Sequence, residues 1–216
     1  MCIRDRPLRY QLNLKRPDQI KKAPNLGPES KVPPGQFLTT KFPELTYGSA
    51  PNVDLATWIF RVFGLVNQEI ELDWESFSNL GWTTLDADFH CVTQWSALDQ
   101  TWDGVPFRQL MDMARPKAEA RFIMAYCFGG YTTNLPLDMA LEEGFLAHKH
   151  GGEPLGQGHG WPLRLIVPSR YGWKSAKWIN GIELMNEDKP GFWEERGYNN
   201  DADPWKEERF WPELTK

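Results

Sequence analysis

The residue whose chemistry is most versatile is Cys91, in the stretch DADFHCVTQWS at residues 86–96. A thiolate is a good nucleophile and a soft ligand for transition metals. A buried cysteine, however, more often packs as a small hydrophobic residue. The chain has three cysteines and no pair spaced C-x-x-C, which favours a reducing compartment over a disulfide scaffold. The residue alone leaves two interpretations open, a core position and a metal ligand.

A second stretch, residues 154–182, contains no aspartate or glutamate, although the net charge of the chain is −5. Its cationic and imidazole side chains are interspersed with glycines: His159, Arg164, Arg170, Lys174, Lys177, and Gly156, Gly158, Gly160, Gly172. Glycine lets backbone N–H groups approach a phosphate, and arginine adds paired hydrogen bonds. Arg164 also interrupts the apolar run PLRLIV, where a half-buried cation would require an anion. A phosphate site and a solvated hairpin face remain the two interpretations, and for Lys174 the alternative is a surface lysine near the phosphate.

Other residues allow two further classes of function. His148 and His150 are two apart and would share one face of a strand, so with Cys91 or His159 they could form the zinc site of a hydrolase. The chain lacks an H-E-x-x-H companion motif, however. Eleven tryptophans could instead stack on sugars in a non-catalytic binding module.

Strand and helix patterns alternate along the chain and predict one α+β domain with mixed β-sheets and short helices. We expect strands at 57–66, 68–72, 83–92, 119–127, 145–150, 161–169 and 175–185. Short helices are expected at 74–80, with Asp73 as N-cap, and within 105–114 and 135–144.

The ends of the chain differ from its middle. Residues 1–50 carry nine lysines and arginines against four acids, so we interpret 1–40 as an irregular basic arm, 41–190 as the domain and 191–216 as an irregular C-terminal wrap of that domain. The net charge argues against nucleic-acid binding. No apolar run is long enough to span a bilayer and no secretory signal is visible, so we expect no membrane span.

Five pieces of the sequence occur in the order typical of one enzyme family: FPELTYGSAP (42–51), FHCVTQWS (89–96), WDGVPFRQLM (102–111), GGYTTNLPLDMAL (129–141) and GHGWPLRLIVPSRYGWKSAKWINGIEL (158–184). The last is the most specific. Over residues 40–190 the chain therefore resembles the sulfite-oxidase-type, molybdopterin-dependent oxidoreductases, in their short, bacterial, reductase-like branch.

The resemblance implies roles for particular residues. Cys91 matches the thiolate that binds molybdenum. The expected cofactor contacts are Thr46, Tyr47, Thr132, His159, Arg164, Ser175, Ala176 and Lys177, with Cys127 near one of them. Two features depart from better-known members, since VTQWS stands where sulfite oxidases have an arginine-rich segment, and Thr46 stands in place of an asparagine.

The resemblance also implies an activity. It is two-electron oxygen-atom transfer to or from a small sulfur- or nitrogen-centred substrate, with molybdenum held by molybdopterin. No haem or flavin motif is visible, so an unidentified partner would supply or accept electrons. Because no twin-arginine export signal is visible, we expect a cytoplasmic protein.

Overall fold

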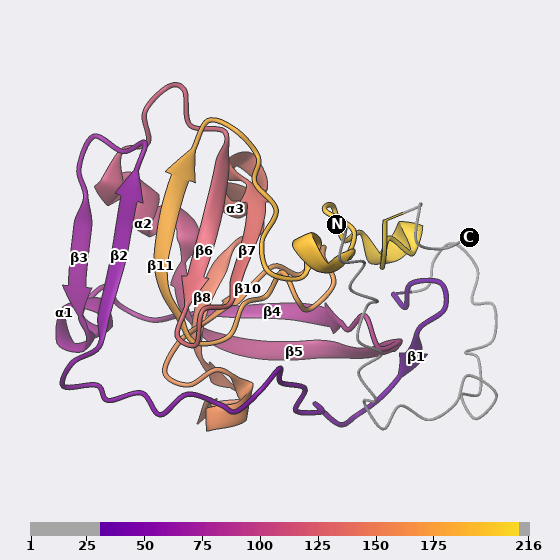
Figure 1. Cartoon of the computed structure of the whole chain (residues 1–216). Helices are drawn as coiled ribbons and strands as arrows, with labels where there is room; N and C mark the ends of the chain where they lie inside the picture. The colour runs from indigo at the N-terminus through magenta and orange to yellow at the C-terminus, as the bar shows by residue number, and fades with distance from the viewer. Residues whose placement is uncertain (1–30, 212–216) are drawn as a thin grey trace, which may run out of the picture.

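The computed structural model describes residues 31–211, which fold into two β-sheets with short helices, as expected for an α+β protein. One sheet has five strands in the order β3-β2-β11-β6-β7, and the other has six, following β1-β5-β8-β10 with β4 beside β5 and β9 beside β8. The first sheet stands upright in Figure 1, and β4 and β5 run across its lower end.

Most elements are short, and the two longest strands, β4 and β5, both belong to the six-stranded sheet. The strands are β1 (Phe37–Leu38), β2 (Ile59–Gly64), β3 (Ile70–Asp73), β4 (Thr83–His90), β5 (Trp95–Pro106), β6 (Phe122–Cys127), β7 (Thr132–Pro136), β8 (Phe145–His150), β9 (Glu153–Pro154), β10 (Arg164–Ile166) and β11 (Ile179–Met185). The helices are α1 (Trp74–Ser78), α2 (Phe107–Ala114) and α3 (Leu137–Glu143), with single 3₁₀ turns at 157–159, 194–196 and 204–206.

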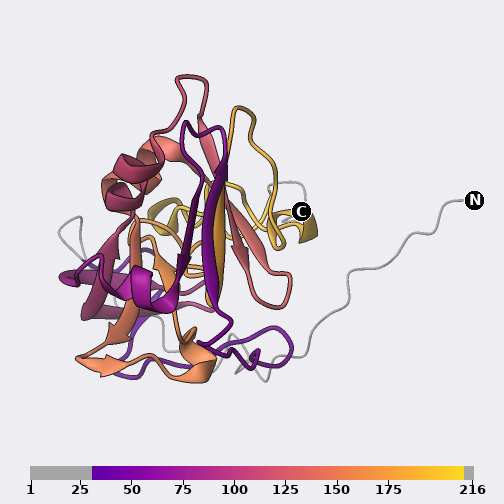
Figure 2. The ribbon, with the colours of Figure 1, turned by 90° about the vertical axis from the view of Figure 1, so that its left-hand side faces the viewer.

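Helices α2 and α3 cover one face of the five-stranded sheet (Figure 2). In α2 the buried residues are Phe107, Leu110, Met111 and Ala114, the i, i+3, i+4, i+7 spacing of one helix face. They share a core with Ile182 and other apolar residues of the sheet. At about 25 cal/mol per Å² of apolar surface buried, this layer is a main source of stability.

Strand β5 was not predicted. Its middle, LDQT, is polar and gives no strand pattern, yet β5 is the longest strand of the described chain. It pairs with β4, β8 and β1, so its backbone is satisfied by three neighbours. The ends are fixed by the buried residues Trp95, Trp102 and Val105. Strand β7 was also missed.

The strand predicted over 175–185 is divided in the structure. Trp178 has a left-handed backbone with φ of 56°, so the chain turns there and β11 begins at Ile179. Residues before the turn pair with β10 instead, through Leu165 N–H to the Ala176 carbonyl at 2.8 Å and a bridge between Arg164 and Lys177. This segment therefore connects the two sheets.

The arm and the wrap both join the body of the domain. Within the predicted basic arm, β1 pairs in parallel with the start of β5. From the wrap, Glu194 inserts a carboxylate that is 2.6 Å from Lys174 Nζ, and both side chains are almost completely buried. The interpretation of Lys174 as a surface lysine is therefore wrong, because its side chain is buried and pairs with this acid.

Among residues 31–211, no helix combines the length and apolar character needed to cross a membrane. The predicted cytoplasmic location stays a prediction.

Candidate active site

Cys91 follows β4 in a tight turn that returns the chain into β5. The turn is closed by Cys91 N–H to the Trp95 carbonyl at 2.8 Å and by Gln94 N–H to the Cys91 carbonyl at 3.0 Å. Gln94 takes a left-handed backbone, φ 72°. The side chain of Cys91 is 8% exposed, and its Sγ lies 3.1 Å from Thr93 Oγ1. The thiol thus lies at the end of a strand on a fully bonded turn.

This turn forms one wall of a cavity of about 300 Å³ at the junction of the sheets. Five separate parts of the chain line it, residues 42–51, 89–95, 128–131, 159–178 and 192–198. Eight of the nine predicted site residues are among the lining residues: Thr46, Tyr47, Cys91, His159, Arg164, Ser175, Ala176 and Lys177. The structure therefore brings Cys91 and the cationic stretch to one place.

Thr132 and Cys127 are not among the lining residues. Thr132 begins β7, and its carbonyl accepts the Phe192 N–H at 2.9 Å. Cys127 ends β6 in the core, where burial alone raises the pKa of its thiol. Tyr131, next to Thr132, lines the cavity. The role of Thr132 as a cofactor contact stays a prediction.

Arg164 is a buried cation on β10, 2% exposed. Its Nη1 donates to the His159 carbonyl at 3.0 Å and its Nη2 to the Ser175 carbonyl at 3.1 Å, while Nε has no hydrogen-bond partner among the described residues. Of its five N–H donors two are therefore used in these bonds. Within the described chain no carboxylate lies within 4 Å of it. Burial lowers the pKa of Arg164 to about 10. With no carboxylate nearby among the described residues, this guanidinium lacks a counter-anion.

Aromatic rings surround the guanidinium. Its central carbon lies 5.8 Å from the Phe42 ring centroid, 5.3 Å from Phe89 and 5.5 Å from Trp102. Such contacts stabilise a cation by about 1–2 kcal/mol when water is excluded. They stabilise the charged form of Arg164 without using its N–H groups as hydrogen-bond donors, and Nε–H has no partner among the described residues.

Lys177 connects two segments at the other side of the cavity. Its Nζ donates to the Leu45 carbonyl at 2.7 Å and also bonds the Gly158 carbonyl and, at 3.4 Å, Thr46 Oγ1. Burial and the Arg164 charge lower the pKa of Lys177 to about 7. The ammonium thus holds the 42–51 segment against the glycine-rich loop beside the cavity.

Gly160 explains why the cationic stretch contains glycine at this point. It has φ of +111°, and a Cβ there would lie 3.0 Å from Arg164 Cβ and 3.2 Å from Lys177 Cα. His159, just before it, bonds the Phe42 carbonyl through Nε2 at 3.1 Å, and burial lowers the pKa of its imidazole. The glycine allows loop and strand to approach closely enough to form the cavity wall.

Burial and neighbouring groups shift the pKa of the Cys91 thiol in opposite directions. Burial raises its pKa, whereas the Thr93 hydrogen bond and the charges of Lys177 and Arg164 lower it, with burial the larger effect. A thiolate at this position would therefore require further positive charge inside the cavity, which a metal cation would supply.

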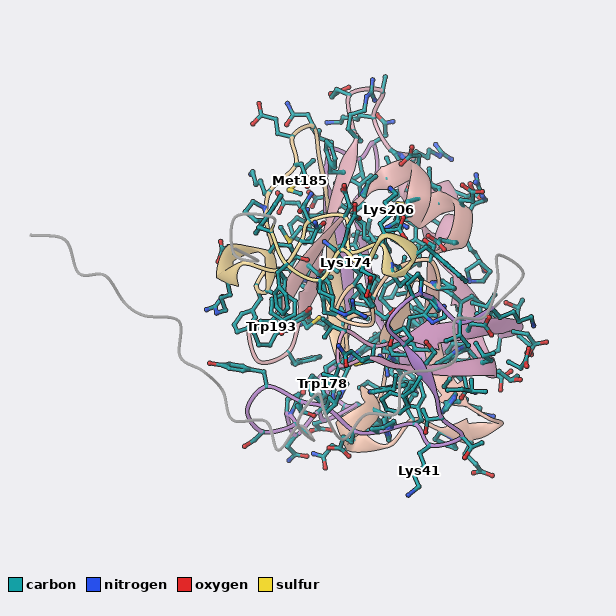
Figure 3. All side chains as sticks on the ribbon, turned by 90° about the vertical axis from the view of Figure 1, so that its right-hand side faces the viewer. Lys41, Lys174, Trp178, Met185, Trp193 and Lys206 are labelled. Atoms are coloured by element: carbon teal, nitrogen blue, oxygen red, sulfur yellow. The ribbon has the colours of Figure 1, made fainter. Side chains whose placement is uncertain are left out.

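The remaining wall comes from aromatic residues that the sequence analysis did not assign to the site. Tyr131 donates its hydroxyl to the Trp173 carbonyl at 2.6 Å, and Trp193 and Tyr198 reach the cavity from the C-terminal wrap. Figure 3 shows Trp178 and Trp193 on the same side of the molecule. Aromatic residues in a sequence most often predict core packing, so only the fold identifies these as lining residues.

The zinc alternative has no support from the geometry. Among the described residues no three His, Cys, Asp or Glu side chains converge to hold a metal. His148 stacks on Trp82 at 4.0 Å between ring centroids, and His150 bonds Gln100 Oε1 through Nε2 at 2.8 Å. Burial is the main reason that the pKa of His150 is lowered to about 4.

The sugar-binding alternative has little support either. Trp58 and Trp102 are buried in the cores, and others line the cavity. The exposed ones among the described residues, Trp82, Trp205 and Trp211, are only 36–48% exposed. Most of the tryptophan side chains therefore pack inside the protein or line the cavity, and few are exposed for stacking on a sugar.

Comparison with known proteins identifies the family. The sequence model of the oxidoreductase molybdopterin-binding domain matches residues 47–193. The chain belongs to this family. It is thus an oxidoreductase of the sulfite oxidase type, whose cofactor is molybdopterin carrying molybdenum. This confirms the family, fold and cofactor expected from the sequence.

Three known proteins resemble the chain in sequence or in fold. The chain is 44% identical over 182 residues to YuiH of Bacillus subtilis, described as an uncharacterized oxidoreductase, covering 83% of this chain and 92% of YuiH. It is 28% identical over 170 residues to a putative protein-methionine-sulfoxide reductase subunit, YedZ1, of Azospira oryzae, covering 77% and 64%. The sulfane dehydrogenase SoxCD of Paracoccus pantotrophus has a similar fold, with a TM-score of 0.61 at 21% identity over 67% of this chain and 42% of that one.

The residues of the cavity fit a phosphorylated cofactor with a metal. Arg164 offers unused N–H donors and lacks a counter-anion, and Lys177 lines the same cavity. The thiol of Cys91 adds a soft donor to that cavity. A cation-rich end and a sulfur ligand are what a phosphate and a thiophilic metal require.

We expect the variant Arg164→Met to lower retention of the cofactor by about tenfold or more, because a charge-assisted contact with phosphate is lost. Removal of the unpaired buried charge favours folding, whereas the carbonyls of His159 and Ser175 lose a donor, so we expect the free energy of unfolding to fall by no more than about 2 kcal/mol. Pterin fluorescence per protein after gel filtration measures the retention. Arg170→Met, in the same acid-free stretch but outside the cavity lining, is the matched control and should retain the parental amount.

The lowered pKa of Lys177 predicts that anion binding in the cavity depends on pH. With a folded-state pKa of about 7, its ammonium is mostly present at pH 6 and mostly absent at pH 8. The affinity of the cofactor-free cavity for sulfate, which keeps its charge over this range, should fall about tenfold between these pH values. Calorimetric titration measures it. Lys177→Gln should bind sulfate weakly at both pH values; a slope as steep as the parent's would contradict the prediction.

Proposed function

We propose that this protein catalyses two-electron oxygen-atom transfer to or from a small sulfur- or nitrogen-centred substrate, with Cys91 Sγ as the protein's ligand to molybdenum. The observation that carries the proposal is the shared cavity of Cys91, Arg164 and Lys177. When bound, the molybdenum cofactor supplies the oxygen-atom and electron-transfer chemistry.

Cys91 would serve as a ligand because its position is fixed and its thiol can lose a proton when a metal binds. The closed turn holds the thiol at the cavity wall, and burial raises its pKa more than the charges of Lys177 and Arg164 lower it. Binding of a metal would release that proton. The same thiol would be a poor nucleophile without the metal, because its pKa is raised.

Arg164 and Lys177 are proposed to bind the cofactor phosphate. The free Nε–H of Arg164 is a donor for a phosphate oxygen, and the Lys177 ammonium adds a second charge. Ser175 and Ala176 fix the geometry, because the Ser175 carbonyl and Oγ and the Ala176 carbonyl bond β10 and the residue after it. The phosphate would hold the cofactor at one end while the thiolate holds it at the other.

The walls of the site would favour a substrate with an apolar body. The cavity that Cys91 lines has aromatic and aliphatic residues in the same wall lining: Phe42, Phe89, Val92, Trp173, Trp193 and Tyr198. A low-polarity surrounding strengthens electrostatic interactions at the reacting atoms. The name of the Azospira relative suggests a sulfoxide as the first substrate to test.

We further propose an external electron-transfer partner and a cytoplasmic location.

Elemental analysis tests the proposal. Protein produced with molybdate in the medium should contain about one molybdenum per chain and release a fluorescent pterin on denaturation. The loaded protein should then be assayed against sulfoxides, N-oxides and sulfite with a redox dye. Zinc in place of molybdenum, or loaded protein inactive on the whole panel, would contradict the proposed function.

A further inference from the structure

The turn that carries Cys91 is bonded to a residue that lies before the matched family region. Gln36, 2% exposed, donates from Nε2 to the Cys91 carbonyl at 3.0 Å across 55 residues of sequence. The family model begins at residue 47, so Gln36 is not part of the matched domain. A buried amide is costly unless it is hydrogen-bonded. Here Nε2 bonds the backbone of the thiol-bearing residue, while Oε1 has no hydrogen-bond partner among the described residues.

Further bonds join the same segment to the turn. Phe37 N–H donates to the Gln94 carbonyl at 2.8 Å, and Thr39 N–H donates to the Ser96 carbonyl at 2.9 Å. These two bonds come from the backbone, as in any strand, and would form with most side chains. The bond from Gln36 is different, because only a side chain with a donor of this length makes it.

The carbonyl of Cys91 therefore accepts two hydrogen bonds, one from Gln94 within the turn and one from Gln36 outside it. The first sets the shape of the turn. The second sets where that turn lies relative to the rest of the sheet. Together they fix the Cys91 backbone from which Sγ reaches the cavity wall.

We propose that Gln36 is a positioning residue that holds the backbone of Cys91 so that its Sγ faces the cavity. The inference rests on the proposed function of Cys91 as metal ligand. The basic arm, interpreted from the sequence as irregular, thereby contributes to the active site through one buried side chain.

The test compares two matched substitutions in the full chain, in a Cys2→Ser background that removes the third thiol. Gln36→Met keeps length and volume but removes the donor. Gln109→Met does the same in α2, where Gln109 Nε2 donates to the Leu80 carbonyl at 2.8 Å, away from the cavity. Metal-free protein is treated with iodoacetamide, and the alkylation rates of Cys91 and Cys127 are followed by peptide mass spectrometry.

Loss of one net hydrogen bond should increase local opening, so Cys91 should be alkylated about fivefold faster in Gln36→Met, with Cys127 unchanged. Gln109→Met should leave both rates at the parental value. In molybdenum-loaded protein, Gln36→Met should lower kcat with little change in KM and should shift the visible thiolate–metal absorption band.

An unchanged Cys91 rate in Gln36→Met would overturn the proposal. Equal acceleration of Cys91 and Cys127 would overturn it too, because it would indicate a general loss of stability. These outcomes are separate from failure of the proposed function, since the alkylation measurement needs no cofactor: a protein without molybdenum in elemental analysis would refute the ligand role of Cys91, whatever the alkylation rates show.

Discussion

The Cys91→Ser variant is expected to fold like the parent and to lose oxygen-atom transfer activity by roughly a thousandfold. A serine hydroxyl is a harder donor than a thiol and stays protonated, so it cannot replace a thiolate at a thiophilic metal. Thr93 already lies 3.1 Å from Sγ and would hydrogen-bond the new hydroxyl, so the loss of stability should be small. Steady-state rates with a sulfoxide and a reduced dye measure the effect.

Cys127→Ser is the matched control for this variant. Cys127 is as buried as Cys91 but belongs to the core of the five-stranded sheet and does not line the cavity. We expect it to keep its activity per bound molybdenum, even if its midpoint of thermal unfolding is lower. A Cys91→Ser protein that is both loaded with molybdenum and fully active would refute the role of Cys91 as ligand.

The second large effect concerns the buried pair of Lys174 and Glu194. Glu194→Gln should destabilise the protein by about 3 kcal/mol, because it leaves the Lys174 ammonium in the interior without an opposite charge. The glutamine keeps an acceptor for the Thr133 hydroxyl and the Trp173 indole, which both donate to Oε1 of the acid. The measured loss therefore reports the charge, and urea unfolding of the two proteins gives it.

Two further variants complete this experiment. Lys174→Met combined with Glu194→Gln should recover most of the loss, because no unpaired charge remains. Glu71→Gln, which removes one side of the exposed pair with Arg61, should cause no measurable change. If Glu194→Gln were as stable as the parent, Lys174 would have to be neutral in the folded protein.

Part of the site could be predicted from the sequence because the composition of one short stretch already indicates its chemistry. The acid-free, glycine-rich stretch indicated an anion site, and Arg164 and Lys177 both line the cavity. Cys91 could be assigned only through the resemblance, since a single cysteine has no pattern of its own. Thr132, assigned through the same resemblance, does not line the cavity, whereas its neighbour Tyr131 does. As contacts to a cofactor, these residues remain predictions.

The parts that could not be predicted depend on partners distant in sequence. Strand β5 is polar in its middle and is stabilised by pairing with three other strands. Glu194 belongs to an acidic tail that looked irregular, and nothing in its neighbourhood indicates that it reaches Lys174. The aromatic wall and the bond from Gln36 are also set by tertiary contacts and not by local pattern.

The wall of the cavity is completed by residues that come late in the sequence. Trp193 and Tyr198 lie about a hundred residues after Cys91 and line the same cavity. During synthesis, a nascent chain that has emerged only as far as Lys177 therefore contains the thiol and both cations but still lacks this aromatic part of the wall.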